Sequence, residues 1–94
     1  MIFSIIVTYQ CGERIGQVLA AILPQVTGVV LVDNGSPADT VARLERLQHE
    51  HPAQITLRCN DKNIGLAAAQ NQGIREALAR GAQWILLLDD DSIP

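Results

Sequence analysis

A run of three aspartates, residues 89–91, directly follows the apolar stretch Trp84–Leu88. Side chains along an extended chain alternate in direction, so Asp89 and Asp91 should point to one side and Asp90 to the other. Two carboxylates on one side repel each other unless a cation lies between or beside them. Hard oxygen ligands suit Mg²⁺ or Mn²⁺, ions that also hold substrate phosphates. The run therefore predicts a divalent-cation site of the D-x-D type, with a solvated acidic loop as the alternative.

A single carboxylate, Asp33, ends a second apolar stretch in the sequence VVLVDNGS. At the end of a strand it could accept a hydrogen bond from a ring N–H or from a sugar hydroxyl. Asp-Asn-Gly-Ser is also a common turn sequence, which would explain the same residues without a ligand. The residues alone favour neither interpretation.

Polar and small residues interrupt an alanine-rich helical segment in NIGLAAAQNQGI. Gln70 and Asn71 lie in its middle, and Gly65 and Gly73 each cost up to about 1 kcal/mol if they lie inside a helix. Small residues would let a ligand lie against the amino terminus of the helix, where the helix dipole favours anions. The alternative is an exposed polar face whose glycines allow close packing of the helix on a sheet.

The elements that must position these residues alternate along the chain. Four short runs rich in Ile, Val and Leu are mostly continuous, as is typical of strands covered on both faces of a parallel sheet. The runs are Ile2–Thr8, Val29–Val32, Ile55–Cys59 and Trp84–Leu88. Helical patterns separate them, so the predicted order is β-α-β-α-β-α-β. This order predicts a single α/β domain over residues 1–94: a doubly wound, mainly parallel sheet of four strands with helices on both faces.

Capping residues mark the ends of the predicted helices. Pro24 should close the first helix, and Ser36 should cap the second, with Pro37 at its first position. Asn63 is expected to cap the third helix, and Gly81 lies where a C-terminal cap belongs. These signals predict where each helix meets the neighbouring loops.

Parallel sheets of this kind bind ligands outside the carboxyl ends of their strands, where the strand order reverses. We therefore expect the site at residues 8–12, 33–36, 60–65 and 89–92. The chain has no G-x-G-x-x-G after its first strand and no G-x-x-x-x-G-K-[ST], which disfavours a dinucleotide-binding loop and a P-loop.

Composition and charge limit the partners and the cellular location that the chain can have. The formal charge of −3 and the scattered Lys and Arg argue against a nucleic-acid partner. Cys11 and Cys59 are too few for a disulfide framework or a zinc site. No apolar run approaches the roughly 20 residues of a transmembrane helix, and no signal peptide is recognisable. The composition therefore predicts a cytoplasmic protein without a transmembrane segment.

Four stretches together resemble one family. FSIIVTYQ, VVLVDNGS, NIGLAAAQNQGI and WILLLDDDS, in this order and spacing, are similar to the amino-terminal half of family-2 inverting glycosyltransferases of the GT-A fold. NIGLAAAQN followed by a strand that ends in L-D-x-D-S looks most like the bacterial rhamnosyltransferases, which use dTDP-rhamnose. The chain would then be a nucleotide-sugar-binding half-domain, with the acceptor half absent.

The resemblance assigns most of the candidate residues to a nucleotide-diphosphate sugar. It places Thr8 and Tyr9 beside the base and ribose, Asp33 on the pyrimidine ring, Asn34 and Gly35 in the turn next to it, and Asn63, Gly65 and Asn71 along the ribose and diphosphate. Asp91 would bind the divalent cation directly, and Asp89 would contact the ribose or a metal-bound water. Gln70 stands where many members carry arginine, so more of the diphosphate charge would fall on the cation.

The family mechanism implied is direct displacement at the anomeric carbon by an acceptor hydroxyl. The resemblance puts the general base, and the acceptor pocket, beyond residue 94, so the chain alone is expected to be inactive. A non-catalytic interaction module that retains the fold is the alternative function. Because the fourth strand is central in the family's sheet, we also expect its edge here to be open and to promote self-association.

Overall fold

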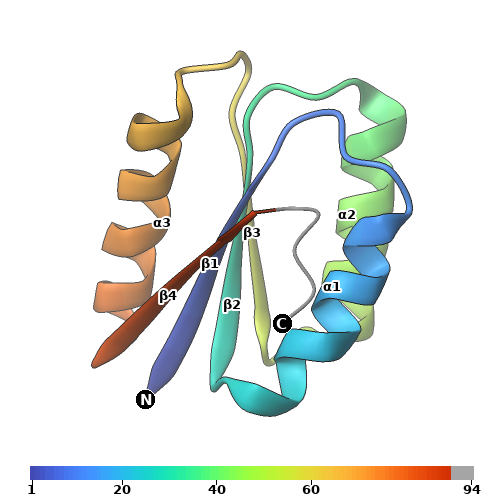
Figure 1. Ribbon diagram of the computed structural model, residues 1–94. Coiled ribbons are helices and arrows are strands. Elements are labelled where there is room, and N and C mark those ends of the chain that lie inside the picture. The colour runs from blue at the N-terminus through green and yellow to red at the C-terminus, as the bar shows by residue number, and fades with distance from the viewer. Residues whose placement is uncertain (90–94) are drawn as a thin grey trace.

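Four strands form one parallel sheet in the order β3-β2-β1-β4, as the computed structural model shows (Figure 1). The structure describes residues 1–89. The strands are β1 (Ile2–Thr8), β2 (Gly28–Asp33), β3 (Ile55–Cys59) and β4 (Trp84–Asp89). β1 pairs with β2 on one side and with β4 on the other, so the strand order reverses at β1. The predicted parallel α/β architecture is confirmed.

Helices cover both faces of the sheet. α1 (Arg14–Ile22), followed by the short 3₁₀ helix η1 (Leu23–Gln25), and α2 (Ala38–Glu50) lie on one face, whereas α3 (Leu66–Ala79) lies on the other (Figure 1). The apolar residues of α1 recur at Ile15, Val18, Leu19 and Ile22, and all four are buried. This spacing forms the single apolar stripe that a helix needs to pack on a sheet.

Two apolar layers hold the helices to the sheet. The α1–α2 layer is built from large aliphatic side chains such as Ile6, Leu31 and Leu44. The α3 layer is thinner, because the helix presents Ala69, Gly73 and Ala77 to the sheet. A Cβ at Gly73 would collide with the side chain of Ile5. The glycine therefore lets α3 approach β1 closely, which confirms the packing interpretation of this residue.

Two of the predicted caps are wrong. α2 begins after Pro37 without a side-chain cap, and the Ser36 hydroxyl instead bonds Asp33. α3 begins after Gly65, and Asn63 does not cap it. In both cases a polar side chain near the helix start is drawn into contacts between loops, which compete with local capping. Gly81, with φ of +92°, follows the end of α3 as expected.

The β4 strand carries exposed apolar side chains. Trp84 is 73% exposed and Leu87 is 46% exposed, while Leu88 packs against the α1–α2 layer. Among residues 1–89, β4 pairs with β1 alone. The predicted open edge is therefore present in this part of the chain. Within the same residues, no helix has the length and apolar character needed to cross a bilayer.

Candidate functional site

The carboxyl ends of the strands meet at one edge of the sheet, which we call the carboxyl edge. Thr8 of β1 is in register with Asp33 of β2, and Asp33 is in register with Cys59 of β3. Asp89 at the end of β4 is in register with Val7. Parallel pairing thus gathers the predicted loops at the place where such sheets bind ligands.

Asp33 is completely buried and forms the centre of the first contact network. Its Oδ1 accepts hydrogen bonds from the Thr8 hydroxyl at 2.8 Å and from the Ser36 hydroxyl at 2.6 Å. Its Oδ2 accepts a third from the Ser36 backbone N–H at 2.8 Å. Hydrogen bonds to a carboxylate are short and strong, and they offset the cost of burying it. The carboxylate therefore fixes the turn after β2 from inside the protein.

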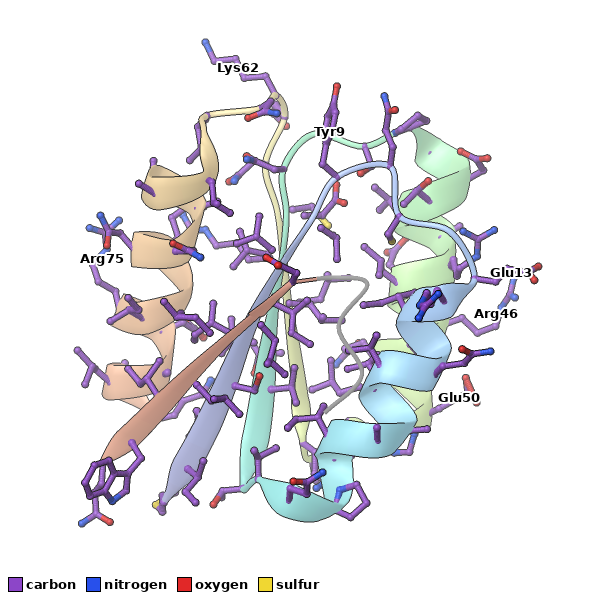
Figure 2. All side chains as sticks on the ribbon, viewed as in Figure 1. Tyr9, Glu13, Arg46, Glu50, Lys62 and Arg75 are labelled. Carbon is purple, nitrogen blue, oxygen red and sulfur yellow. The ribbon has the colours of Figure 1, made fainter. Side chains whose placement is uncertain are left out.

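Ser36 extends this network to the loop after β1. Its Oγ accepts a hydrogen bond from the backbone N–H of Gln10 at 2.7 Å. Gln10 has φ of +52°, a left-handed conformation that is uncommon for residues other than glycine. Tyr9, next to it, is 48% exposed and projects beyond the strand ends (Figure 2). The Asp33–Ser36 contact thus holds the backbone that presents the tyrosine ring.

Asn34 joins the turn after β2 to the loop that leads into α3. Its Nδ2 donates to Asn63 Oδ1 at 3.0 Å, and its Oδ1 accepts from the backbone N–H of Ile64 at 3.0 Å. The backbone N–H of Gly65 donates to Asn63 Oδ1 at 2.8 Å. The structure therefore brings Asn34, Asn63 and Gly65 into one cluster.

Gly35 and Gly65 occupy positions that demand glycine. Their φ values are +91° and +90°, a region that side-chain-bearing residues rarely adopt. A Cβ on Gly35 would lie 2.7 Å from the backbone carbon of Lys62, so this glycine also permits close approach of the two loops. Both predicted glycines thus have conformational roles at the carboxyl edge.

Asn71 lies apart from these contacts. It is exposed on α3, two residues away from each of the sheet-facing residues Ala69 and Gly73. Two residues correspond to about 200° around a helix, so Asn71 lies on the side away from the sheet. Its predicted contact with ribose or diphosphate stays a prediction.

The carboxylates at the end of β4 are described in part. Asp89 is exposed, whereas Asp91 lies outside the described residues, as do Asp90 and Ser92. Within residues 1–89, no group of three or more His, Cys, Asp or Glu side chains is placed to hold a metal ion. The exposed carboxylate of Asp89 has the oxygen chemistry that Mg²⁺ and Mn²⁺ prefer, and its position at the carboxyl edge fits such an ion.

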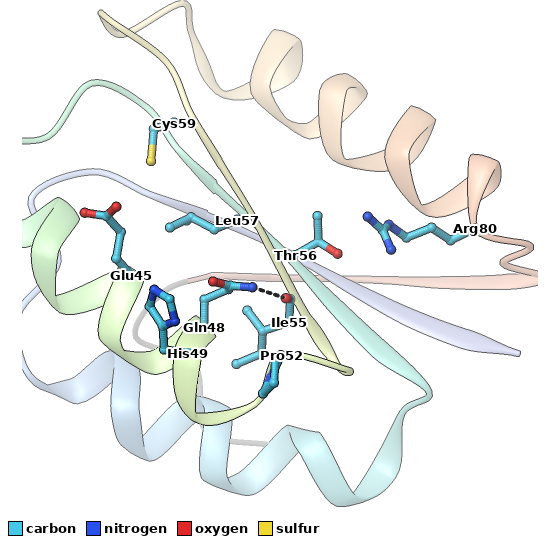
Figure 3. Close-up of a pocket in the computed structure, with 9 residues that line it drawn as sticks. All are labelled: Glu45, Gln48, His49, Pro52, Ile55, Thr56, Leu57, Cys59 and Arg80. Atoms are coloured by element: carbon cyan, nitrogen blue, oxygen red, sulfur yellow. Dashed lines mark hydrogen bonds between the residues drawn. The ribbon is translucent and has the colours of Figure 1, made fainter.

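A hollow of about 500 Å³ lies elsewhere, along the outer side of β3 (Figure 3). Glu45 and His49 of α2 line it together with Cys59 and Arg80. Burial, with the charges of Asp33 and Glu45, raises the pKa of the Cys59 thiol. The thiol is therefore neutral near pH 7 and a poor nucleophile. The Cys59 thiol of the hollow is thus not activated, and the network at the carboxyl edge is the better candidate site.

Ser36, like Asn63, has a role in this site that differs from the predicted helix cap. It was expected to cap α2, but its hydroxyl links Asp33 to Gln10. The signal was its place three residues after a strand-ending aspartate, where a side chain and a backbone N–H can both return to the carboxylate. The same position before α2 also suits a helix cap, so the sequence does not distinguish a cap from a bond to Asp33.

Comparison with known proteins shows that the chain is similar to glycosyltransferases of one family. The sequence model of the family described as Glycosyl transferase family 2 matches residues 4–94. The chain is 34% identical over 92 residues to dTDP-rhamnosyl transferase RfbF of Shigella flexneri, covering 97% of the chain and 29% of that protein. It is 29% identical over 93 residues to galactofuranosyltransferase GlfT1 of Mycobacterium tuberculosis, covering 96% of the chain and 30% of that protein.

One solved structure is similar over nearly the whole fold. It is the mannosyltransferase PcManGT of Pyrobaculum calidifontis, in complex with GDP-Man and Mn²⁺. The TM-score is 0.84 at 26% sequence identity, and the alignment covers 98% of the chain but 28% of the mannosyltransferase. The chain thus spans less than a third of the length of these proteins.

Proposed function

Because the chain belongs to glycosyl transferase family 2, we propose that its carboxyl edge binds the nucleotide diphosphate of an activated sugar. The observation that carries the proposal is the pair of networks around Asp33 and Asn34, which gather three predicted loops at that edge. The similar mannosyltransferase was solved with GDP-Man and Mn²⁺, which supports this class of ligand.

The base and ribose lie at the end of β1, beside Thr8 and Tyr9, in this proposal. Tyr9 offers an exposed ring for stacking on the base. Thr8 is fully buried, so it contributes through its hydrogen bond to Asp33. Asp33 accepts three hydrogen bonds, two at Oδ1 and one at Oδ2, so Oδ2 keeps one acceptor site for a ring N–H. Since Asp33 is fully buried, the turn at residues 33–36 must open slightly for a base to reach this oxygen.

The ribose and diphosphate extend toward the loop before α3. With its Oδ1 engaged, Asn63 can offer its Nδ2 donors to ribose or phosphate oxygens. Gly65 leaves room beside the first turn of α3, since nothing lies within 4 Å of a Cβ built there. Asn71 is the third proposed contact of this group.

A divalent ion, Mg²⁺ or Mn²⁺, belongs at the end of β4. Asp91 would be its direct ligand, and Asp89 would contact the ribose or a metal-bound water. The ion would neutralise charge on the diphosphate leaving group. Asp89 supports this proposal by its exposed carboxylate at the carboxyl edge.

The reaction served is transfer of the sugar to an acceptor hydroxyl with inversion at the anomeric carbon. We place the general base and the acceptor pocket in sequence beyond residue 94, because the relatives are more than three times as long as the matched region. The chain alone should therefore bind a donor without transferring its sugar. Among donors, dTDP-rhamnose is favoured by the 34% identity to a dTDP-rhamnosyl transferase.

Calorimetry of dTDP, UDP and GDP, each with and without Mn²⁺, tests this proposal. We expect binding that requires Mn²⁺, with dTDP the tightest ligand, and we expect Asp91→Ala to remove the Mn²⁺ requirement together with most of the affinity. Equal affinity in Asp91→Ala and in the unsubstituted chain would remove the metal assignment. No binding of any nucleotide at millimolar concentration would instead favour a non-catalytic interaction module.

The exposed edge of β4 favours a second role, association with another copy of this chain. Trp84 and Leu87 of β4 expose apolar surface. Within residues 1–89, β4 pairs with β1 on one side and with no strand on the other. Such edges template pairing with a further strand. A cytoplasmic location is proposed for the protein as well, and a cysteine at position 59 that forms no disulfide among the described residues agrees with it.

A further inference from the structure

The side chain of Asn34 uses its entire hydrogen-bonding capacity within the protein. Nδ2 donates to Asn63 Oδ1 at 3.0 Å and to the Gly65 carbonyl at 3.2 Å. Oδ1 accepts from the Ile64 N–H at 3.0 Å and from Asn60 Nδ2 at 3.4 Å. An asparagine amide has two donors and two acceptor lone pairs, so none is left for a ligand. At 3% exposure the side chain is also closed to solvent.

All four partners belong to one short segment, residues 60–65, which leads into α3. Backbone contacts join the same two segments, since the Asn60 N–H donates to the Asp33 carbonyl at 2.8 Å. Gly35 packs against the backbone of Lys62, where a Cβ would be 2.7 Å away. The turn at 33–36 and the segment 60–65 therefore interlock through one amide and one glycine.

We infer that Asn34 is a positioning residue of the donor site, an inference that rests on the proposed function. It holds residues 60–65 in the conformation that binds the diphosphate, without touching the ligand. An unheld loop would lose conformational freedom when the nucleotide bound, and this entropy loss would weaken the affinity. Fixing the loop beforehand removes that loss.

Asn34→Asp is the sharpest variant, because it keeps the shape of the side chain. An ionised carboxylate cannot donate, so both Nδ2 bonds are lost and an oxygen is set against Asn63 Oδ1 and the Gly65 carbonyl. Gln25→Glu is the matched control, an amide-to-acid change at the end of η1 whose lost bond to the Ala21 carbonyl lies on the exposed surface.

Hydrogen exchange of the full chain, followed by NMR, measures the effect on the loop. In Asn34→Asp we expect the protection factor of the Ile64 amide to fall about tenfold or more, since a partly buried hydrogen-bond network is broken. Protection of Val30 and Leu31 in β2 should be unchanged. The affinity for dTDP with Mn²⁺ should fall about tenfold in the same variant. Gln25→Glu should change none of these values.

Two outcomes would overturn the inference: unchanged Ile64 protection in Asn34→Asp, or reduced protection with unchanged dTDP affinity. If Asn34→Asp unfolds, hydrogen exchange of the unsubstituted chain tests the inference. There the Asn34 side-chain amide protons should exchange far more slowly than those of Gln25, and equal exchange would contradict the inference. If the unsubstituted chain binds no nucleotide at all, the proposed function fails, and with it the donor-site role, while the exchange data still report whether Asn34 holds the loop.

Discussion

The hydroxyl oxygen of Ser36 lies 2.6 Å from Oδ1 of Asp33, three residues earlier in the chain. The same hydroxyl accepts the N–H of Gln10 at 2.7 Å, so one oxygen joins the loops after β1 and β2. Through this contact a buried carboxylate controls the backbone beside Tyr9. The arrangement of the loops at the carboxyl edge therefore depends on Ser36, which bonds Asp33 and Gln10 and does not cap α2.

Ser36→Ala should destabilise the fold and weaken nucleotide binding together. The change removes one bond to a buried carboxylate and leaves the Gln10 N–H without its partner, which should lower the free energy of unfolding by about 1–3 kcal/mol. Ser4→Ala is the control, because the Ser4 hydroxyl is buried in β1 with no hydrogen-bond partner among residues 1–89. That change should be neutral or slightly stabilising. Urea unfolding of both variants measures the difference, and equal effects would contradict the role of Ser36.

Gly35→Ala should be more damaging than its size suggests. The residue has φ of +91°, and the added Cβ would lie 2.7 Å from the Lys62 backbone. We expect a loss of more than about 1 kcal/mol in the free energy of unfolding. Gly16→Ala, in α1 with open space around the Cβ position, should stabilise by about 0.5–1 kcal/mol. Thermal unfolding compares the two, and a tolerated Gly35→Ala would show that the loops do not interlock.

Cys59 should react more slowly with thiol reagents than an unstructured cysteine peptide at the same pH. Its pKa is raised by burial and by the charges of Asp33 and Glu45, so less thiolate is present at any pH below that pKa. The pH at which alkylation reaches half its maximal rate should therefore lie above the peptide's value. Glu45→Gln should move this midpoint downward. A midpoint at or below that of the peptide would contradict the described surroundings of the thiol.

Trp84→Gln should weaken self-association with little effect on folding, because the side chain is 73% exposed at the β4 edge. Leu66→Gln is the control, since Leu66 is 57% exposed but lies on α3. Sedimentation velocity over a range of concentrations should show association in the unsubstituted chain and in Leu66→Gln, and less in Trp84→Gln. A monomer at every concentration in all three would contradict the edge-pairing proposal.

The sheet was predictable because burial on both faces leaves a direct mark on composition. Ile2–Thr8 and Ile55–Cys59 were predicted with the bounds observed, as continuous aliphatic runs separated by helical patterns. The meeting of the predicted loops at one edge followed from topology, since parallel strands end there. The strand bounds depend on local composition, and the edge at which the strands end follows from the order of strands and helices, so both can be predicted from the sequence.

The contacts inside the site were not predictable in the same way. Ser36 and Asn63 each had a local explanation as a helix cap, and the structure uses both side chains between loops instead. Asn34 was expected to shape its turn as part of the donor site, whereas its side chain bonds partners 26 to 31 residues away and has no group left for a ligand. Such long-range pairings depend on how the loops pack, which no periodicity in the sequence encodes.

Donor binding at the carboxyl edge is tested most sharply by ¹H–¹⁵N NMR of the chain titrated with dTDP in the presence of Mg²⁺. We predict that amide shifts concentrate at residues 9–12, 33–36 and 60–65, and that omitting Mg²⁺ abolishes most of them. Shifts confined to the hollow along β3, or no shifts at millimolar dTDP, would contradict the assignment of the carboxyl edge as the donor site.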